Sequence, residues 1–333
     1  MQLKAISLSV AGLIHGTLLG CQASNTNPQN AALGAMKNTA STNGMSEMNL
    51  GRQDRLSVLT FNMQHRNNPK QLSVMADHLQ SDLAETPDFI LCQEVLFERS
   101  RNPEEANTAA LLANDLDCHG RGTKRTTDHE GVAIISRYPF LFYDELHLKS
   151  QTSRLLLGFR RVSVMGEFQV PGTGLVRVVN VHFTNWGFER HVRIKQLAET
   201  LQWLAAREAQ VHADVNILGG DFNIQFGSDE LDLVSQGKYA DLFQFNNFNT
   251  HEPTRGGKGK PNIRVDYIFV SSPDREMNIA GAGEQRLWLQ GLKSPGKSKF
   301  WLSDHVPVLH EYTSRQPEVV ACGEQPINNN LAQ

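Results

Sequence analysis

The sequence lacks a strong excess of charge of either sign and has few cysteines. Its 333 residues include 32 Lys and Arg against 35 Asp and Glu, which gives a formal net charge of -3, and only 4 Cys. Bulk charge therefore attracts no polyanion, and any contact with nucleic acid would have to rest on a local basic patch. The chain also shows no internal repeat and no apolar run of the about 20 residues that a transmembrane helix needs. Its length fits one large α/β domain or two smaller ones.

The first residues have the composition of an export signal. Residues 1–20 begin with the weakly basic MQLK and continue as an apolar stretch interrupted by small polar residues and His15, so we expect a signal peptide. The stretch ends in Leu-Leu-Gly before Cys21, which resembles the lipobox of bacterial lipoproteins, in which the cysteine is lipidated. The alternative is an ordinary signal peptide with a chance cysteine. The lipobox predicts an exported lipoprotein of the bacterial cell envelope, attached to a membrane through Cys21.

Composition divides the rest of the chain into three segments. Residues 21–53 are rich in Asn, Ser, Thr, Gly and Ala without a periodic apolar face, and we expect a flexible tether after the lipidated cysteine. Residues 54–315 carry the periodic apolar patterns and should form the folded domain. Residues 316–333 form a polar C-terminal tail.

The remaining cysteines lie in different surroundings. Cys92 lies in the apolar run FILC and is expected to be a buried thiol. Cys118 and Cys322 lie in Gly-rich or polar sequence, and an exported chain could join them in a disulfide. Separation in sequence says nothing about their distance in space, so this pairing stays open.

Apolar periodicity predicts strands that partly alternate with helices. Strand-like runs occupy residues 56–63, 88–95, 131–138, 155–170 with a possible bend at Gly166, 175–183, 215–223 and 264–271. Helical stripes are formed by Leu72, Met75, Leu79 and Leu83 after Asn68-Pro69, and by Ile194, Leu197, Leu201 and Leu204 after Trp186. Strands separated by helices, mixed with strands that follow one another directly, suggest two sheets with outer helices.

Polar side chains stand at the ends of these strands. They are Asn62, Gln93, Glu94, His182, Asp221, Asn223, Asp266, Asp304 and His305. One such residue is usually a solvated cap or turn residue, but so long a series is unexpected. Residues i and i+2 of a strand point to the same side, so Asp221 and Asn223 should face one way if the extended geometry persists. Asp266 lies within an apolar run and needs a partner, for which His305 is the natural candidate.

Seven blocks carry a family resemblance when they are taken in order. TFNM, CQEV, GVAIISRYP, VVNVHF, GGDFNI, RVDYIFV and SDHVPV, between Arg55 and Glu311, resemble the endonuclease/exonuclease/phosphatase superfamily, which includes DNase I-like nucleases, AP endonucleases, bacterial sphingomyelinases and inositol phosphatases. The resemblance implies a DNase I-like α/β four-layer sandwich, in which two mixed β-sheets lie face to face with helices outside. It further implies a monomeric, metal-dependent hydrolase of phosphoric esters, with its active site where the sheet ends meet.

The resemblance also implies a metal site made of oxygen ligands. Glu94 would be the principal ligand of Mg²⁺, or of Mn²⁺, with Asn62 beside it and Asp304 nearby, directly or through water. Magnesium prefers one or two carboxylates and keeps several waters, which suits these side chains. The cation would neutralise charge that develops on the phosphate.

Five further residues would carry the chemistry. His305 would be the general base, with its ring oriented by Asp266, because a buried carboxylate fixes the tautomer and favours the cation that forms. Asp221 and Asn223 would position the attacking water and the phosphate. His182 would donate to a phosphate oxygen or to the leaving group.

Departures from the family patterns bear on the substrate. AP endonucleases usually carry a tyrosine at the position of His182, and inositol phosphatases follow their Asp with a Leu-Asn-Tyr-Arg pattern that GDFNIQ lacks. We therefore expect a phosphodiesterase that resembles sphingomyelinases or cleaves phospholipid head groups. The alternatives are a DNase I-like nuclease and a catalytically silent binding protein on the same fold. The substrate could thus be a phospholipid, a nucleic acid or a small phosphodiester.

Several loop segments should decide among these substrates. We expect substrate preference to lie in residues 97–130, 143–154 and 246–262. The basic segment TRGGKGKPNIR (254–264) could contact a phosphate backbone or be a solvated loop, and the clusters NWGF and KSKFW could meet a lipid interface or simply pack against the fold.

Overall fold

The computed structural model describes most of the predicted folded domain. The described residues are 55–64, 69–81, 83, 85–97, 107–124, 130–150, 161–185, 190–231, 253–255, 263–272, 276–279, 285–286 and 303–315. The predicted signal peptide, Cys21, the tether, the C-terminal tail, Cys322 and the cluster KSKFW lie outside them, as does all of NWGF except Asn185. Among the helices within these ranges, none has both the length and the apolar character to cross a membrane.

Strands dominate the order of elements along the chain. The elements are β1 (Arg55–Asn62), α1 (Pro69–Ser81), β2 (Phe89–Leu96), α2 (Thr108–Asp115), β3 (His119–Lys124), β4 (Glu130–Ser136), β5 (Phe142–His147), β6 (Val162–Val170), β7 (Gly174–His182), α3 (Arg190–Glu208), β8 (Val215–Asp221), η3 (Asp229–Leu231), β9 (Asp266–Ser271), β10 (Glu276–Ile279), β11 (Gln285–Arg286) and β12 (Val308–Arg315).

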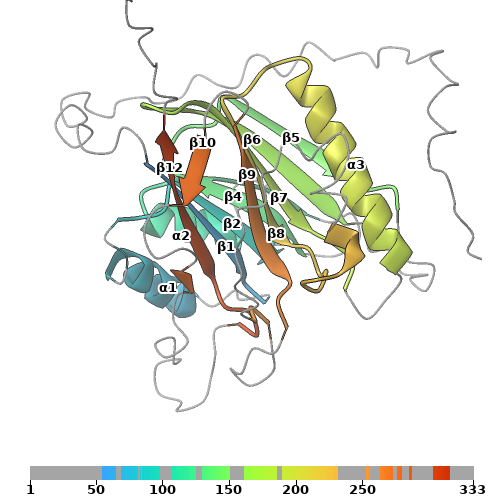
Figure 1. Ribbon diagram of the computed structural model, residues 1–333. Coiled ribbons are helices and arrows are strands. Elements are labelled where there is room, and N and C mark those ends of the chain that lie inside the picture. The colour runs from blue at the N-terminus through green and yellow to red at the C-terminus, as the bar shows by residue number, and fades with distance from the viewer. Residues whose placement is uncertain are drawn as a thin grey trace, which may run out of the picture. The chain divides into compact units, whose positions relative to one another are not determined.

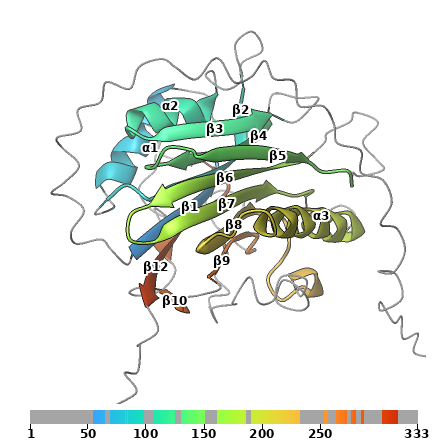
Figure 2. The same cartoon turned by 90° about the horizontal axis from the view of Figure 1, so that it is seen from above.

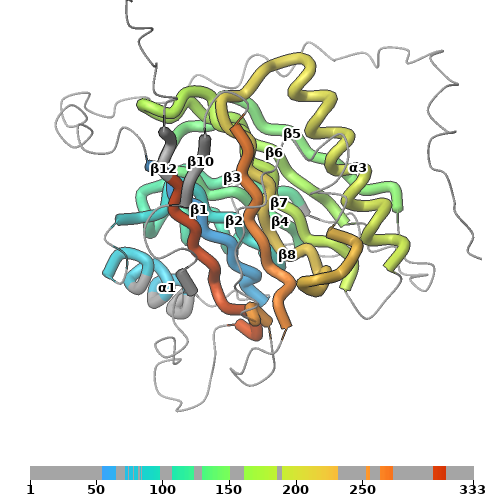
Figure 3. The backbone as a smooth tube through the Cα atoms, in the orientation of Figure 1, coloured from blue at the N-terminus to red at the C-terminus, as the bar shows by residue number. Residues whose placement is uncertain are grey.

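The described strands form two mixed sheets. The first sheet has the order β10-β12-β1-β2-β4-β3, with β11 also paired to β12, and the second has the order β5-β6-β7-β8-β9. Each sheet contains one parallel pair, β1 with β2 and β7 with β8, among antiparallel neighbours. Figure 3 shows β1, from the start of the domain, beside β12, from its end. The predicted pair of mixed sheets is thereby confirmed.

Three apolar layers hold the two sheets and their helices together. Side chains of β1, β2 and β4 pack against those of β6, β7 and β8 in the core between the sheets. The outer face of the first sheet is covered by α1 and α2, and that of the second by α3. Figure 1 shows α1 and α2 on one side of the sheets and α3 on the other, and Figure 2 shows α3 next to β8. The arrangement is the predicted four-layer α/β sandwich.

The local sequence explains the main elements. All seven residues of β8 are buried, as expected for a central strand whose two faces are both covered. The stripe of Leu197, Leu201 and Leu204 on α3 is buried, whereas Ile194 lies at its edge and is only half-buried. Helix α2 begins after Asn107, whose side chain accepts a hydrogen bond from the backbone N–H of Ala110 at 2.8 Å.

Two segments that the sequence suggested as loops contain regular structure. Residues 97–130 include α2 and β3, and residues 143–154 include most of β5. The predicted bend at Gly166 is absent, because β6 pairs with β7 without interruption on both sides of this residue. A Cβ at Gly166 would lie 2.6 Å from the ring of Phe168, so the glycine makes room for aromatic packing.

Both cysteines within the described ranges are free thiols. Cys92 is fully buried, as predicted, and burial raises its pKa to about 12. Burial, with the charges of Asp117 and Asp88, raises the pKa of Cys118 to about 11. Its disulfide with Cys322 stays a prediction, since Cys322 lies outside the described residues.

A buried ion-pair cluster lies between the second sheet and α3. Arg177 donates through Nε to Oε1 of Glu167 at 2.8 Å, and Arg207 donates through Nη2 to Oε2 at 2.6 Å. Burial raises the pKa of Glu167, but the hydrogen bonds and charges of the two arginines outweigh that effect and hold it below its usual value. Glu167 is therefore ionised at neutral pH.

Candidate active site

Strand register gathers the polar residues of the second sheet at one end. His182, the last residue of β7, lies opposite Asp221, the last residue of β8. Asp221 in turn lies opposite Asp266, the first residue of the antiparallel strand β9. Three side chains distant in sequence are thus neighbours, because two parallel strands end where an antiparallel one begins.

The first sheet presents Asn62 and Glu94 in the same way. Asn62 ends β1 and lies opposite Gln93 of β2. The register of β2 against β4 shifts between Gln93 and Val95, which leaves Glu94 in a β-bulge with φ 52°. A left-handed glutamate is strained by roughly 1–3 kcal/mol, and such strain clusters at functional sites. Glu94 is half-buried in the bulge, whereas Gln93 and Val95 on either side of it are buried.

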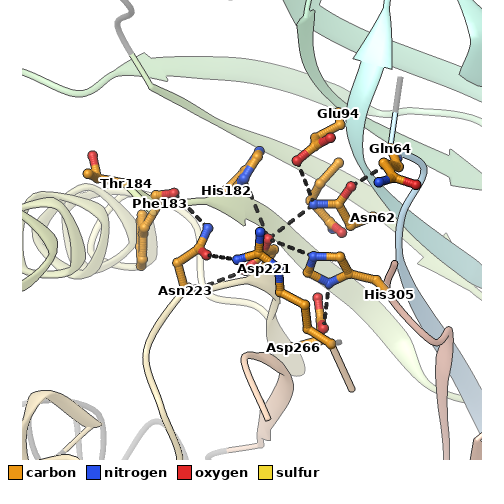
Figure 4. Close-up of polar contacts among 12 residues, drawn as sticks. Asn62, Gln64, Glu94, His182, Phe183, Thr184, Asp221, Asn223, Asp266 and His305 are labelled. Atoms are coloured by element: carbon orange, nitrogen blue, oxygen red, sulfur yellow. Dashed lines mark hydrogen bonds and ion pairs between the residues drawn. The ribbon is translucent and has the colours of Figure 1, made fainter. Parts of the chain in front are cut away.

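Asn62 joins the two sheets. Its Nδ2 donates to Oε1 of Glu94 and to Oδ2 of Asp221, each at 3.1 Å. Its Oδ1 accepts from the backbone N–H of Gln64 at 3.0 Å, which fixes the amide orientation. Figure 4 shows Asn62 between the two carboxylates. One amide nitrogen therefore draws two acidic oxygens from different sheets towards the same point.

The GGDFN segment departs from the expected extended geometry. Strand β8 ends at Asp221, and Asn223 has φ 52°. The backbone N–H of Asn223 donates to Oδ1 of Asp221 at 2.9 Å, which makes an Asx turn. The preceding Gly220 has φ 138°, and a Cβ there would lie 2.1 Å from the carbonyl oxygen of Val181. The pair is held at the site by a turn rather than by strand alternation.

Asp266 and His305 form the expected buried pair. Nδ1 of His305 lies 2.8 Å from Oδ2 of Asp266, and both side chains are 2% exposed. The opposite ring nitrogen, Nε2, lies 3.7 Å from Oδ2 of Asp221. If Nδ1 carries the proton of a neutral ring and donates it in the hydrogen bond to Asp266, Nε2 directs its lone pair towards Asp221. Figure 4 shows the ring of His305 between the two aspartates.

Hydrogen bonds to neighbouring loops fix this pair. Ser303 donates through Oγ to the carbonyl oxygen of Asn62 at 2.7 Å and accepts from the backbone N–H of His305 at 3.0 Å. Buried Thr254 accepts through Oγ1 from the backbone N–H of Asp266 at 3.2 Å, and its carbonyl oxygen accepts from Val306 at 2.7 Å. Both partners of the pair are therefore held through their backbones.

The charges shift two pKa values in this cluster. Burial lowers the pKa of His305, but the carboxylates of Asp266, Asp221 and Asp304 outweigh it and raise that pKa to about 9. Burial raises the pKa of Asp221 to about 6, against the lowering effects of His305, Arg255 and the hydrogen bond from Asn62. Perturbed values of this kind are typical of active sites.

The structure adds two arginines that the sequence interpretation did not select. Arg161 Nη1 lies 2.9 Å from Nδ1 and 3.0 Å from Nε2 of His182. Only one nitrogen of a neutral imidazole is an acceptor, so Arg161 donates to one of the two and the tautomer of His182 decides which. Arg255 donates through Nη1 to Oδ1 of Asn223 at 3.1 Å. The only signal for Arg255 was the basic run 254–264, and none pointed to Arg161.

Each predicted site residue belongs to this cluster, but Asp304 lies at its edge. Its side chain is 31% exposed, with Oδ2 3.5 Å from Nε of Arg255 and Oδ1 4.0 Å from Nε2 of His305. His182 lies on the other side, with Nε2 3.5 Å from Oδ2 of Asp221. Asp221, rather than Asp304, is the second carboxylate that Asn62 contacts.

Comparison with known proteins identifies the family. Residues 59–305 match the Endonuclease/Exonuclease/phosphatase family, a match that spans well over half of the chain. The chain belongs to this family. Its members are hydrolases that act on phosphoesters, and the chain is accordingly a phosphoesterase of the DNase I-like superfamily. No curated protein sequence matched the chain.

Several solved structures share the fold of this chain. A functionally unknown conserved protein from Enterococcus faecalis V583 superimposes with a TM-score of 0.58 at 17% identity, covering 78% of this chain and 100% of the other. A family protein from Bacteroides thetaiotaomicron gives a TM-score of 0.58 at 18% identity, with 78% and 97% covered. Truncated TDP2 from Caenorhabditis elegans gives 0.54 at 16% identity, also with 78% and 97% covered. At these identities the likeness concerns the fold alone.

Two groups of side chains could hold the divalent metal typical of the family. Asp221, Asp266 and His305 offer ligand atoms that all lie within 4.8 Å of one another. Nδ1 of His305 and Oδ2 of Asp266 already share a 2.8 Å hydrogen bond, and an ion bound to Nε2 instead would occupy the lone pair that a base needs. Glu94 and Asp221 instead bring carboxylate oxygens together at Nδ2 of Asn62, and hard cations such as Mg²⁺ prefer such oxygens; Asn62 would have to turn its amide to offer Oδ1, which here accepts from Gln64. The second group fits a divalent cation better.

Proposed function

We propose that this protein is a magnesium-dependent phosphodiesterase. The observation that carries the proposal is the buried Asp266–His305 pair, whose second ring nitrogen, Nε2, faces Asp221, one of the two carboxylates that converge at Asn62. An oriented imidazole next to an oxygen-rich cation site is what hydrolysis of a phosphate ester needs. Glu94 and Asn62, with Asp221 or Asp304, would hold the cation, and Mn²⁺ is the alternative ion.

The charge of the site supports the need for a cation. The described ionisable groups are Glu94, Asp221, Asp266 and Asp304 against Arg161, Arg255, His182 and His305. The negative charge of four carboxylates therefore leaves no surplus of positive charge for a phosphate anion, even when both histidines are protonated. A bound divalent cation would offset this charge, admit the phosphate and bring the pKa of His305 down towards the range in which Nε2 accepts a proton.

Each step of hydrolysis can be assigned to one of these side chains. Asp221 orients a water near Nε2 of His305, and the water proton moves to Nε2 as its oxygen bonds to phosphorus. The bond from phosphorus to the leaving oxygen breaks at the same time, and His182 donates a hydrogen bond to that oxygen. Solvent then protonates the leaving alcohol, and His305 returns its proton to solvent. Asp266 favours the imidazolium that forms in between.

The substrate proposal rests on the sequence. The lipobox before Cys21 and His182 in place of tyrosine support an exported, lipid-anchored monomer that cleaves phospholipid head groups, as sphingomyelinases do. A DNase I-like nuclease is the second candidate, and the arginines beside Asn223 and His182 favour it as much as they favour a lipid head group.

The test is hydrolysis by the purified full chain. Sphingomyelin vesicles, phosphatidylinositol phosphate vesicles, plasmid DNA and bis(p-nitrophenyl) phosphate are offered in Mg²⁺, with and without chelator, to the wild type and to His305→Ala. Turnover that is lost with chelator and in His305→Ala supports the proposal and names the substrate. Turnover that survives both treatments contradicts it, and no turnover by folded wild type favours the silent binding protein.

A further inference from the structure

The amide of Asn223 has both ends engaged. Its Nδ2 donates to the carbonyl oxygen of Phe183 at 3.1 Å, and its Oδ1 accepts from Nη1 of Arg255 at 3.1 Å. The side chain is 2% exposed, so solvent does not compete for these atoms. An amide bound in this way keeps one N–H of Nδ2 for a phosphate, the group that its position beside Asp221 suggests it would contact.

Arg255 is directed into the site by its backbone. It pairs with His305 in an antiparallel bridge, and residues that lie opposite each other in such a bridge direct their side chains to the same face. Asn223 Oδ1 and the more distant Asp304 Oδ2, at 3.5 Å from Nε, hold the guanidinium from two sides. Its side chain is 22% exposed, so the group is fixed and still accessible to a ligand.

The guanidinium keeps donors available. Of its five N–H bonds, those on Nη2 find no acceptor among the residues that the structure describes, and the contact of Nε with Asp304 is longer than a good hydrogen bond. A planar fork with unused donors matches two oxygens of a phosphate. Asn223 has less capacity, because its Oδ1 accepts from Arg255 and one of the two N–H bonds of its Nδ2 is used for Phe183.

We propose that Arg255 binds the non-bridging oxygens of the substrate phosphate and that Asn223 is a positioning residue which acts through Arg255. This inference rests on the proposed function, since it concerns the substrate of the same site. It assigns one cation of the basic segment 254–264, Arg255, to the phosphate being cleaved. The arginine thereby supplies the positive charge that faces the phosphate from the side of Asn223.

The experiment measures kinetics and phosphate binding together. Wild type, Arg255→Ala, Arg255→Lys, Asn223→Ala and the double variant are assayed on bis(p-nitrophenyl) phosphate in Mg²⁺, and each is titrated with inorganic phosphate by calorimetry. Arg137→Ala is the matched control, because Arg137 follows β4 and contacts Asp88 and Glu85 at the opposite end of β2 from Glu94. Thermal unfolding checks that every variant is folded.

Loss of a charge-assisted bidentate contact should lower kcat/KM and phosphate affinity by roughly tenfold to a hundredfold in Arg255→Ala. Arg255→Lys keeps the charge but not the fork, so we expect most of that loss, and added guanidinium chloride should restore part of the activity of Arg255→Ala alone. In the Arg255→Ala background, the further substitution Asn223→Ala should lower kcat/KM and phosphate affinity only slightly more.

Three results would overturn the inference. Active wild type with unchanged kcat/KM in both Arg255 variants removes Arg255 from the phosphate site while leaving the proposed function intact. Additive losses in the double variant show that Asn223 binds phosphate by itself. Equal phosphate affinity of wild type and Arg255→Ala refutes the contact even if no diester is turned over, so failure of the proposed function is recognised separately.

Discussion

Replacing Asp266 with Asn tests the role of the buried pair most directly. The carboxylate lies 2.8 Å from Nδ1 of His305, with both side chains 2% exposed. A pKa of His305 raised from 6.5 to about 9 corresponds to roughly 3 kcal/mol in favour of the imidazolium, and Asp266 contributes to this through its charge and its hydrogen bond. Asn removes the charge and permits the wrong tautomer. We expect kcat to fall by about 10²–10⁴-fold.

The assay is steady-state hydrolysis of bis(p-nitrophenyl) phosphate at saturating Mg²⁺. KM should change little, because Asp266 acts on His305 and does not contact the substrate. Oδ1 of Asp266 is buried without a hydrogen-bond partner among the described residues. An amide in its place should therefore change the free energy of unfolding by about 1–3 kcal/mol. Urea unfolding measures this change separately from kcat. Asp229→Asn, on the exposed surface, serves as the control. A folded Asp266→Asn variant with wild-type kcat would refute the reasoning.

Three further predictions probe the cation site and the fold. Glu94→Gln should weaken Mg²⁺ binding measured by calorimetry at least tenfold and abolish metal-dependent turnover; unchanged binding would place the cation elsewhere. Glu167→Gln should lower the free energy of unfolding by roughly 1–3 kcal/mol at pH 7, because fully buried Arg177 keeps Glu208 but loses its second carboxylate partner, and Arg207 loses its ion pair with Glu167. Since the folded pKa of Glu167 lies below its usual 4.5, the difference from wild type should persist above that pH and shrink as the pH falls below it; a constant difference would contradict the ion pair. Gly220→Ala should destabilise the protein by at least about 3 kcal/mol in urea unfolding, whereas Gly227→Ala, also at positive φ but with nothing within 4 Å, should cost about 1 kcal/mol; equal losses would rule out the clash.

The sequence predicted the strands and one contact of the site. Strand β8 and the helix stripes are readable from periodicity, since buried faces require apolar side chains at fixed spacing. The pairing of Asp266 with His305 is predictable because a carboxylate in an apolar strand needs a partner. Segments 119–124 and 142–147 were missed as strands, because half-exposed or Gly-containing strands lack a clear alternation.

Other features of the site depend on contacts between distant segments. Asn62 contacts Asp221 across 159 residues, and the guanidinium of Arg255 meets Asn223 across 32. The bulge at Glu94 and the turn at Asn223 are left-handed conformations, which a polar side chain adopts only where surrounding contacts hold it. The sequence alone determined which chemical groups lie at the strand ends. Buried positions in a strand require apolar side chains, so the polar residues that follow them are visible in the sequence. Tertiary structure decided which of them meet, because hydrogen bonds and charges act over a few ångströms of space and not along the chain.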